Sequence, residues 1–429
     1  MNSNDRRTPL TLLKVLAVSV MLPDEVGFYI FGLRFTAARV LMILLIPYLI
    51  AQFFRLLVTG RYRFVLADAL VPITATWMII AVSEVNGIDA ALNHTGPVLL
   101  EFSVGYAASR FLLIDHGEAL SFVDFLCRII AIVGLLGFLD TLAHRFVLHE
   151  LASSLFGNSI PLSIAGVDEG GDERLGLLRA MSTLEHPILF GTTCAIGLLL
   201  ATAVPIRARW FVILSSGLGA VLALSSAPIQ AIAMGFGLLI YNRILRRMRY
   251  RWFVLIILAG FGAVLILEII PDPLGFAFSH FVLDAQTAWF RTWIWTTGVA
   301  AVAQSPWLGV GWFIPQDYGI PGTVDSIWLL WALIYGVPGS VLLGISMLGS
   351  ASLPTQGRDV CLTFNEMKLG TIIGILIFLI VFLGFTVDFF GSGWILIPML
   401  VGIRAHLGEL GQSRTRYLVA RNEVRFAQG

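Results

Sequence analysis

The sequence predicts an all-α polytopic membrane protein, a single membrane domain over residues 1–429. Two observations carry this prediction. Hydrophobic residues make up 57% of the chain and charged residues only 13%, which is too apolar for a soluble fold of this length. Apolar windows of about 20 residues, the length that crosses roughly 30 Å of hydrocarbon, recur along the whole chain. We expect the lipid bilayer as a partner and no nucleic acid.

These windows predict about twelve transmembrane helices. We place them at 9–23, 34–57, 64–85, 96–114, 119–140, 184–203, 209–225, 227–244, 252–270, 326–348, 369–389 and 392–406. Two arginines precede the first window, but no convincing small-residue cleavage site follows it. We therefore expect a transmembrane helix there and not a signal peptide.

Arginine and lysine are sorted to alternate connections between these spans. They gather in the even-numbered connections and the C-terminal segment: Arg61, Arg63, Arg207, Arg209, Arg243, Arg246, Arg247, Arg249, Arg251, Arg358, Lys368, Arg404, Arg414, Arg416, Arg421 and Arg425. By the positive-inside rule, these connections and both termini are cytoplasmic, and 407–429 is a basic cytoplasmic tail. Two long connections, 141–183 and 271–325, then fall on the external side.

The second long connection leads into the most unusual stretch of the chain. Residues 288–339 contain most of the 11 tryptophans, with Arg291 isolated among them. A helix over 289–303 that carries one cation among aromatic residues is typical of a segment lying in the membrane interface. We predict a lid-like helix there, outside the membrane.

Positive charge is scarce in the two external loops, so their arginines are informative. They are Arg145, Arg174, Arg179 and Arg291. A guanidinium donates paired hydrogen bonds to a diphosphate and does not lose its charge. The alternatives are contact with lipid phosphates or, for Arg174, with the acidic run at 168–173. The spacing of that run does not match a calcium loop.

Several motifs follow one another in a specific order. They are Arg179 to Gly191, which includes Glu185-His186-Pro187; Arg-x-x-Ile-Trp from Arg291, followed by Ser-Pro-Trp-Leu-Gly-Val-Gly to Gly311; Asp325-Ser326 with Leu329; and Gly336-Val337-Pro338-Gly339. Together they resemble the signature region of the O-antigen ligase and polysaccharide polymerase superfamily, over roughly residues 170–345. The resemblance implies a GT-C-like fold in a bacterial inner membrane, with 141–183 and 271–325 as large periplasmic loops.

The resemblance also implies an activity. Such proteins are glycosyltransferases that need neither a metal nor a cofactor, and they act on a glycan attached to undecaprenyl diphosphate. They join its reducing end to a hydroxyl of another lipid-linked repeat in polymerases, or of lipid A-core in ligases, and direct attack inverts the anomeric centre. A chain-length regulator and a flippase of the same pathway are the further partners implied.

Residue roles follow from matching positions. The resemblance assigns the diphosphate to Arg291 and to Arg179 or Arg174, because fixed positive charge stabilises the leaving group. Asp325, with His186 as its substitute, is the candidate base for the acceptor hydroxyl. The structural alternatives are that Asp325 caps the next helix and that His186 is a hydrogen-bonding residue at a helix start.

Three more residues complete the predicted substrate-binding set: Glu185, Trp295 and Ser326. The alternative for the tryptophans of this region is a belt of interfacial anchors. Stacking on sugars or acyl chains is the role that we predict for Trp295.

Two departures from the family pattern favour polymerisation. Asp325-Ser326 occupies the place of a His-Asn pair in ligases, and Ser225-Ser226-Ala227-Pro228 that of a Ser-Arg pair in many relatives. We therefore predict a polymerase, with an O-antigen ligase as the alternative. A transporter or flippase is the alternative from another class, for which an internal repeat and helices broken near mid-membrane are expected.

Ionisable residues inside the predicted spans are costly and therefore mark candidate functional positions. They are Glu101, Arg110, Arg128 and Asp388. We predict that Glu101 pairs with Arg128 on the neighbouring antiparallel helix. A transporter would instead use such residues as a proton or ion relay.

Overall fold

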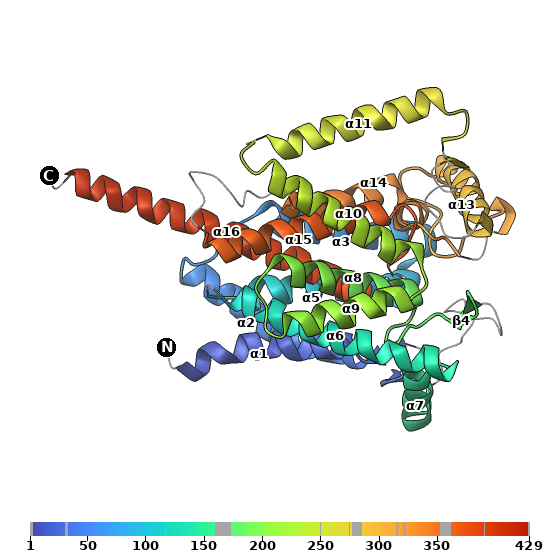
Figure 1. The fold of residues 1–429 in the computed structure, drawn as a ribbon, viewed down its shortest axis with the longest axis horizontal. Helices are drawn as coiled ribbons and strands as arrows, with labels where there is room; N and C mark the ends of the chain where they lie inside the picture. The colour runs from blue at the N-terminus through green and yellow to red at the C-terminus, as the bar shows by residue number, and fades with distance from the viewer. Residues whose placement is uncertain are drawn as a thin grey trace.

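The computed structural model describes residues 3–427 apart from 31–32, 116, 159–172, 249, 274, 277–284, 315, 321–322, 352–361 and 390. Long helices run side by side and form a bundle, and both termini emerge at the same end of it (Figure 1). We call the opposite end of the bundle the far end.

Among the described residues, seven helices are long and apolar enough to cross a membrane. They are α2 (Ala37–Val58), α3 (Leu66–Asn86), α6 (Glu118–Ala143), α11 (Arg251–Ile269), α14 (Ile327–Ala351), α15 (Phe364–Leu383) and the part Gly393–Leu410 of α16 (Gly393–Ala427). The chain is therefore a multi-pass helical protein whose apolar helices indicate a lipid bilayer environment.

Five further helices occupy the remaining predicted spans. They are α1 (Ser3–Val20), α5 (Gly96–Leu112), α8 (Pro187–Ala203), α9 (Arg209–Leu222) and α10 (Ser226–Ile244). Every predicted span thus overlaps one helix, while a total of about twelve crossings stays a prediction. The last helix, α16, continues to Ala427 through most of the predicted tail.

The shorter elements connect these helices. They are the hairpin β1 (Gly27–Ile30) and β2 (Leu33–Thr36), α4 (Ile88–Ala90), η1 (Ala91–Thr95), α7 (Val147–Phe156), the hairpin β3 (Glu173–Arg174) and β4 (Leu177–Leu178), α13 (Ala285–Gln304) and η2 (Gln316–Tyr318). The elements α7, β4 and α13 lie at the far end of the bundle (Figure 1). The helix predicted over 289–303 is thus present as part of α13.

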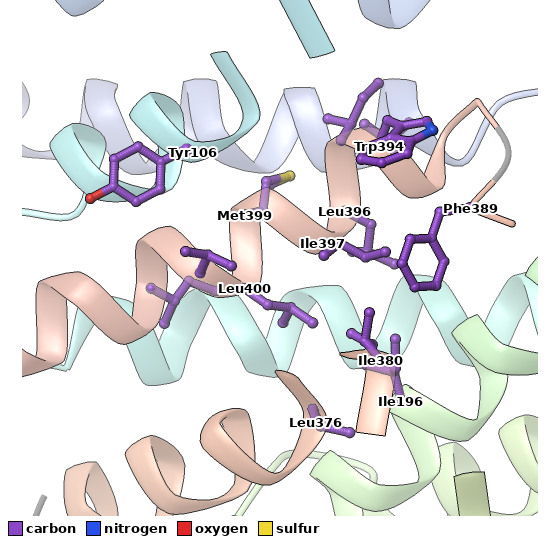
Figure 2. Close-up of a cluster of buried hydrophobic side chains, with 14 of the residues drawn as sticks. Tyr106, Ile196, Leu376, Ile380, Phe389, Trp394, Leu396, Ile397, Met399 and Leu400 are labelled. Carbon is purple, nitrogen blue, oxygen red and sulfur yellow. The ribbon is translucent and has the colours of Figure 1, made fainter. Parts of the chain in front are cut away.

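The core forms where α5, α8, α15 and α16 meet. Figure 2 shows part of it, with Tyr106 from α5, Ile196 from α8 and the apolar side chains of α15 and α16 around them. Glycines allow α5 and α16 to approach closely, because a Cβ at Gly105 would lie 2.8 Å from the carbonyl oxygen of Ile395. Small residues serve the same purpose at other membrane helix contacts.

The predicted pair between Glu101 and Arg128 is wrong. Glu101 instead accepts a hydrogen bond from Nε of Arg39 on α2 at 2.8 Å, and Arg128 pairs with Asp124 one turn earlier on its own helix at 2.9 Å. The reason is that α5 packs against α2, and pairing within one helix requires no second element. These charges are therefore held in local ion pairs.

Arg110 is also paired. It is 1% exposed and donates to Asp68 of α3, at 2.9 Å from Nε, and to Glu409 of α16. Three helices are thus joined by one buried guanidinium. Such an arrangement is costly to break, because removal of one partner leaves an uncompensated buried charge.

The Gly-rich motifs form one structural unit at a break in α14. Gly336 has φ 75° and ψ 171°, which interrupts the helix. The turn after α13 fills the break: the Val337 amide donates to the carbonyl of Pro306 at 2.8 Å, and a Cβ at Gly309 would lie 2.4 Å from the carbonyl oxygen of Leu333. The two glycine-containing motifs therefore occur together because their backbones are in contact.

We expect Gly336→Ala to destabilise the protein by at least about 2 kcal/mol, because the backbone region that Gly336 adopts is essentially restricted to glycine. A Cβ there would also lie 2.0 Å from the carbonyl oxygen of Trp307. The measurement is the Tm of detergent-purified protein. Gly237→Ala on α10 is the matched control, since a Cβ at that position meets nothing within 4 Å. Equal Tm values for the two variants would contradict this account of the break.

Candidate functional site

Six polar side chains from four parts of the chain meet at the far end of the bundle. Charges within this group shift the pKa values of His186, Arg291, Asp325 and Asp388, which requires proximity. We call them the polar cluster: Arg174, Arg179, His186, Arg291, Asp325 and Asp388. Five of the six are residues that the sequence predicted for the site.

Arg291 is carried by α13, which packs on the start of α14. Gly298 makes this contact possible, because a Cβ there would lie 2.6 Å from a methyl carbon of Leu329. The side chain of Arg291 is 4% exposed, and its Nε is buried with no hydrogen-bond partner among the described residues. A buried donor without a partner is costly, so the position favours a ligand that accepts hydrogen bonds.

The electrostatics of Arg291 also favour an anion. Burial lowers the pKa of Arg291, Asp325 opposes this effect with its negative charge, and the positive charge of Arg174 adds to it. The guanidinium stays charged, because arginine keeps its proton in proteins. One nearby carboxylate thus leaves the positive charge only partly compensated.

Arg179 and Arg174 are fixed by the C-terminal end of α9. Nε of Arg179, which is 6% exposed, donates to the carbonyl of Ala223 at 3.3 Å. Arg174, half-buried in β3, donates to the carbonyl of Leu224 at 3.1 Å. Cations are favourable at a helix C-terminus, where carbonyl groups lack helical partners. The two guanidinium groups are therefore held in place before any ligand arrives.

Asp325 directly precedes α14, and the cap of that helix is made by its neighbour. The Ser326 hydroxyl accepts from the Leu329 amide at 3.4 Å and donates to the carbonyl of Gly384 at 3.1 Å. The carboxylate of Asp325 interacts electrostatically with the arginines: burial raises its pKa, and the positive charges of Arg291 and then Arg179 oppose that shift. Asp325 is therefore placed to act as a base beside the arginines.

His186 is the N-cap of α8. Its Nδ1 accepts a hydrogen bond from the Ile188 amide at 3.1 Å. Burial, and then the positive charges of Arg179 and Arg174, lower the pKa of His186 to about 3. The ring is therefore neutral at neutral pH, with its proton on Nε2 because Nδ1 accepts. In this state Nε2 of His186 is a donor and not a base, which favours Asp325 as the first candidate base.

This account of His186 makes a prediction. His186→Asn should keep the helix cap and retain most activity, because asparagine is a good N-cap, whereas His186→Ala should cost about 1 kcal/mol of stability. The measurements are the Tm of the purified variants and, on the expectation of a polysaccharide polymerase, the polysaccharide made by complemented cells. Loss of all polysaccharide in His186→Asn, at unchanged Tm, would make His186 the base after all.

The other predicted substrate-binding residues have local partners. The Glu185 carboxyl accepts from the Ser392 amide at 3.1 Å. It lines a narrow pocket with Asp24 and Glu101, and burial, followed by the charge of Asp24, raises its pKa well above the usual value. The Trp295 indole donates to the carbonyl of Phe385 at 3.1 Å. Together with the capping residue Ser326, they are engaged in structural contacts, and their substrate-binding roles stay predictions.

Asp388 is the member of the polar cluster that the predicted site did not include. The sequence singled it out only as a charge at the end of an apolar span, whereas it lies in the connection between α15 and α16. Burial raises the pKa of Asp388 to about 7; the hydrogen bond from the Phe389 amide opposes the shift, and the negative charge of Asp325 adds to it. Asp388 is therefore able to exchange a proton near neutral pH.

The acidic run at 168–173 raises the question of a bound metal ion. Residues 168–172 of this run lie outside the described residues. Within the part of the chain that the structure describes, no group of three His, Cys, Asp or Glu side chains is arranged to hold a metal ion.

No model of a known protein family matches the chain, and no curated protein matches it in sequence. The chemistry of the polar cluster and the motif resemblance therefore have to indicate the function.

Proposed function

We propose that this protein is a polysaccharide polymerase. It joins oligosaccharide repeats linked to undecaprenyl diphosphate, at the periplasmic face of a bacterial inner membrane, within a GT-C-like fold. The observation that carries the proposal is the buried Arg291, whose Nε has no hydrogen-bond partner among the described residues, beside Asp325 and Arg174. A diphosphate supplies both the acceptor atoms and the negative charge that this position lacks.

The leaving group is stabilised by arginine in this proposal. As the bond between the anomeric carbon and the diphosphate oxygen breaks, negative charge builds on the diphosphate. Arg291, Arg179 and Arg174 are fixed close to one another before the reaction, so they stabilise that charge without having to reorganise. The reaction then needs no metal ion for this purpose.

The acceptor hydroxyl is activated by a carboxylate. The oxygen of the acceptor hydroxyl attacks the anomeric carbon on the side opposite the diphosphate, which inverts that centre. The proton of the hydroxyl passes to Asp325. Asp388, whose charge interacts with that of Asp325, has a pKa raised to about 7 by burial, so it is suited to take part in returning this proton to solvent. Bond making, bond breaking and proton transfer are then balanced.

The helix α13 serves as an interfacial lid in this proposal. It carries Arg291 on its buried side, while Trp289 is 65% and Trp293 37% exposed. Exposed tryptophans at a membrane surface anchor a helix among the lipid headgroups. The lid thus sits where a lipid-linked donor presents its diphosphate.

A transporter or flippase is the competing class. The break of α14 at Gly336 is a feature that transporters share. Here the backbone of the turn after α13 fills the break, and the Trp77 indole donates to the carbonyl of Tyr335 at 2.9 Å. Because the break is filled, it supports a rigid site better than it supports a path for a transported substrate.

The test is complementation of a strain that lacks this protein, with analysis of the lipid-linked intermediates. Single repeats that accumulate on the periplasmic side when the site is inactivated support a polymerase. Long lipid-linked chains left untransferred indicate a ligase. Repeats trapped on the cytoplasmic side indicate a flippase.

A further inference from the structure

The segment between Arg179 and His186 is held in an unfavourable conformation. Ser182 has φ 58°, in the left-handed region. Asp140, at the C-terminal end of α6 and 0% exposed, accepts hydrogen bonds from the amides of Ser182 at 2.7 Å and Met181 at 3.2 Å. Strained backbone of this kind persists only where its surroundings fix it. The segment thus depends on side chains outside the polar cluster.

His149 holds the other end of this segment. It is 5% exposed, and its Nε2 lies 3.1 Å from the carbonyl oxygen of Leu184. Its Nδ1 lies 2.9 Å from Oε1 of Glu25, which is itself 2% exposed. Leu184 directly precedes Glu185 and His186. One imidazole therefore connects the loop after α1, the helix α7 and the entry to the polar cluster.

Both ring nitrogens of His149 make hydrogen bonds. A backbone carbonyl only accepts, so Nε2 donates to the Leu184 carbonyl. Nδ1 and the Glu25 carboxyl share a proton between them, which orients the ring. Removal of either side chain therefore frees the Leu184 carbonyl or the ring that holds it.

Charged groups also lie around His149. The charged and titratable groups that face it are Glu25 and, from α6, Asp140, with whose carboxyl it interacts electrostatically. The Phe146 ring stands edge-on to the His149 ring, with 6.5 Å between the two ring centroids. The Arg145–Glu150 pair lies on the exposed side, with side chains 64% and 52% exposed. The near groups are therefore acidic.

The helix α7 is a firm support for this residue. Asn158, just after α7, donates to the backbone carbonyls of Glu25 and Gly27. The helix projects across the direction of the bundle at the far end (Figure 1) and exposes Leu151, Leu155 and Phe156. Both ends of α7 are thus tied to the residues around Glu25.

We propose that His149 is a positioning residue: paired with Glu25, it holds the Leu184 carbonyl and thereby fixes the segment that carries Arg179 and His186. Loss of the His149 side chain releases Leu184 and loosens that segment, and polymerisation then weakens. This inference rests on the proposed function for its effect on activity, but not for its effect on structure.

The structural test is amide hydrogen exchange of the full chain in lipid nanodiscs. His149→Gln and Glu25→Gln should lower the protection of residues 181–186 about tenfold, since each weakens the hydrogen bonds that hold the Leu184 carbonyl. Glu150→Gln is the matched control, because it changes a carboxylate on the exposed side of α7. Equal protection in His149→Gln and Glu150→Gln would overturn the proposal.

The functional test compares polysaccharide length in complemented cells at equal membrane levels. His149→Gln cells should make much less polymer than the wild type, whereas Glu150→Gln cells should make the wild-type amount. If Arg291→Ala abolishes the polymer while His149→Gln makes wild-type polymer, the positioning role is wrong and the proposed function stands. If exchange changes as expected but Arg291→Ala makes normal polymer, the positioning role stands and the proposed function fails.

Discussion

Arg291→Ala is expected to lower polymer formation about 10²-fold to 10³-fold, the usual result of removing one fixed group that stabilises developing negative charge. The side chain is 4% exposed and its Nε has no hydrogen-bond partner among the described residues. Arg291→Lys should recover little of the activity, because an ammonium lacks the planar fork that binds a phosphate through two parallel hydrogen bonds. The measurement is polysaccharide length in complemented cells, together with the amount of lipid-linked repeat.

The control separates this site from general loss of positive charge. Arg145→Ala removes another arginine of the predicted external loops, one whose side chain is 64% exposed and pairs with Glu150 at 3.3 Å. It should make wild-type polymer at equal membrane levels. Normal polymer in Arg291→Ala would remove the proposed diphosphate site and return transport to first place.

The second large effect is expected for Asp325→Asn, which preserves shape but removes the base. General base catalysis contributes typically about 10²-fold to 10⁴-fold, so activity should fall by that range. Burial raises the pKa of Asp325, and a base acts only when ionised. The wild-type rate should therefore rise with pH through this raised pKa until the base is fully ionised. The pH profile of polymer formation by purified protein measures this.

The Asp325→Asn substitution should lower activity but should not lower the stability of the protein. A group whose pKa is raised by folding is held more readily in its protonated form, so its ionisation costs stability as the pH rises. At neutral pH the variant should thus have a Tm equal to or above that of the wild type. Asp317→Asn, on an exposed residue of the same loop, should change neither activity nor Tm. A variant that is inactive only because its Tm falls would contradict the assigned role.

Much of the site was visible in the sequence because rare residues stand out in apolar surroundings. Arg291 is an isolated cation among aromatic residues, and Asp325 stands just before an apolar run. The structure brings both together with Arg174 and Arg179. Asp388 stands out in the sequence for its charge but cannot be linked to the site there, because nothing in the local sequence shows which helix ends meet.

The glycine motifs illustrate the same limit. The sequence presents Gly309 and Gly336 as parts of two separate motifs. Both positions require glycine because the turn after α13 contacts the break in α14. A Cβ at Gly336 would lie 2.0 Å from the carbonyl oxygen of Trp307. Spacing along the chain does not reveal such a contact.

The positions of the long apolar helices follow from the sequence alone, because span length and hydropathy are local properties that the bilayer thickness selects. The partners of the charged side chains follow only from the packing of the whole chain. Glu101 pairs with Arg39 and not with Arg128, and His149 reaches Glu25 and Leu184 across the far end of the bundle. Pairing depends on which helix faces meet and how side chains are directed there, and these follow from packing of the whole chain.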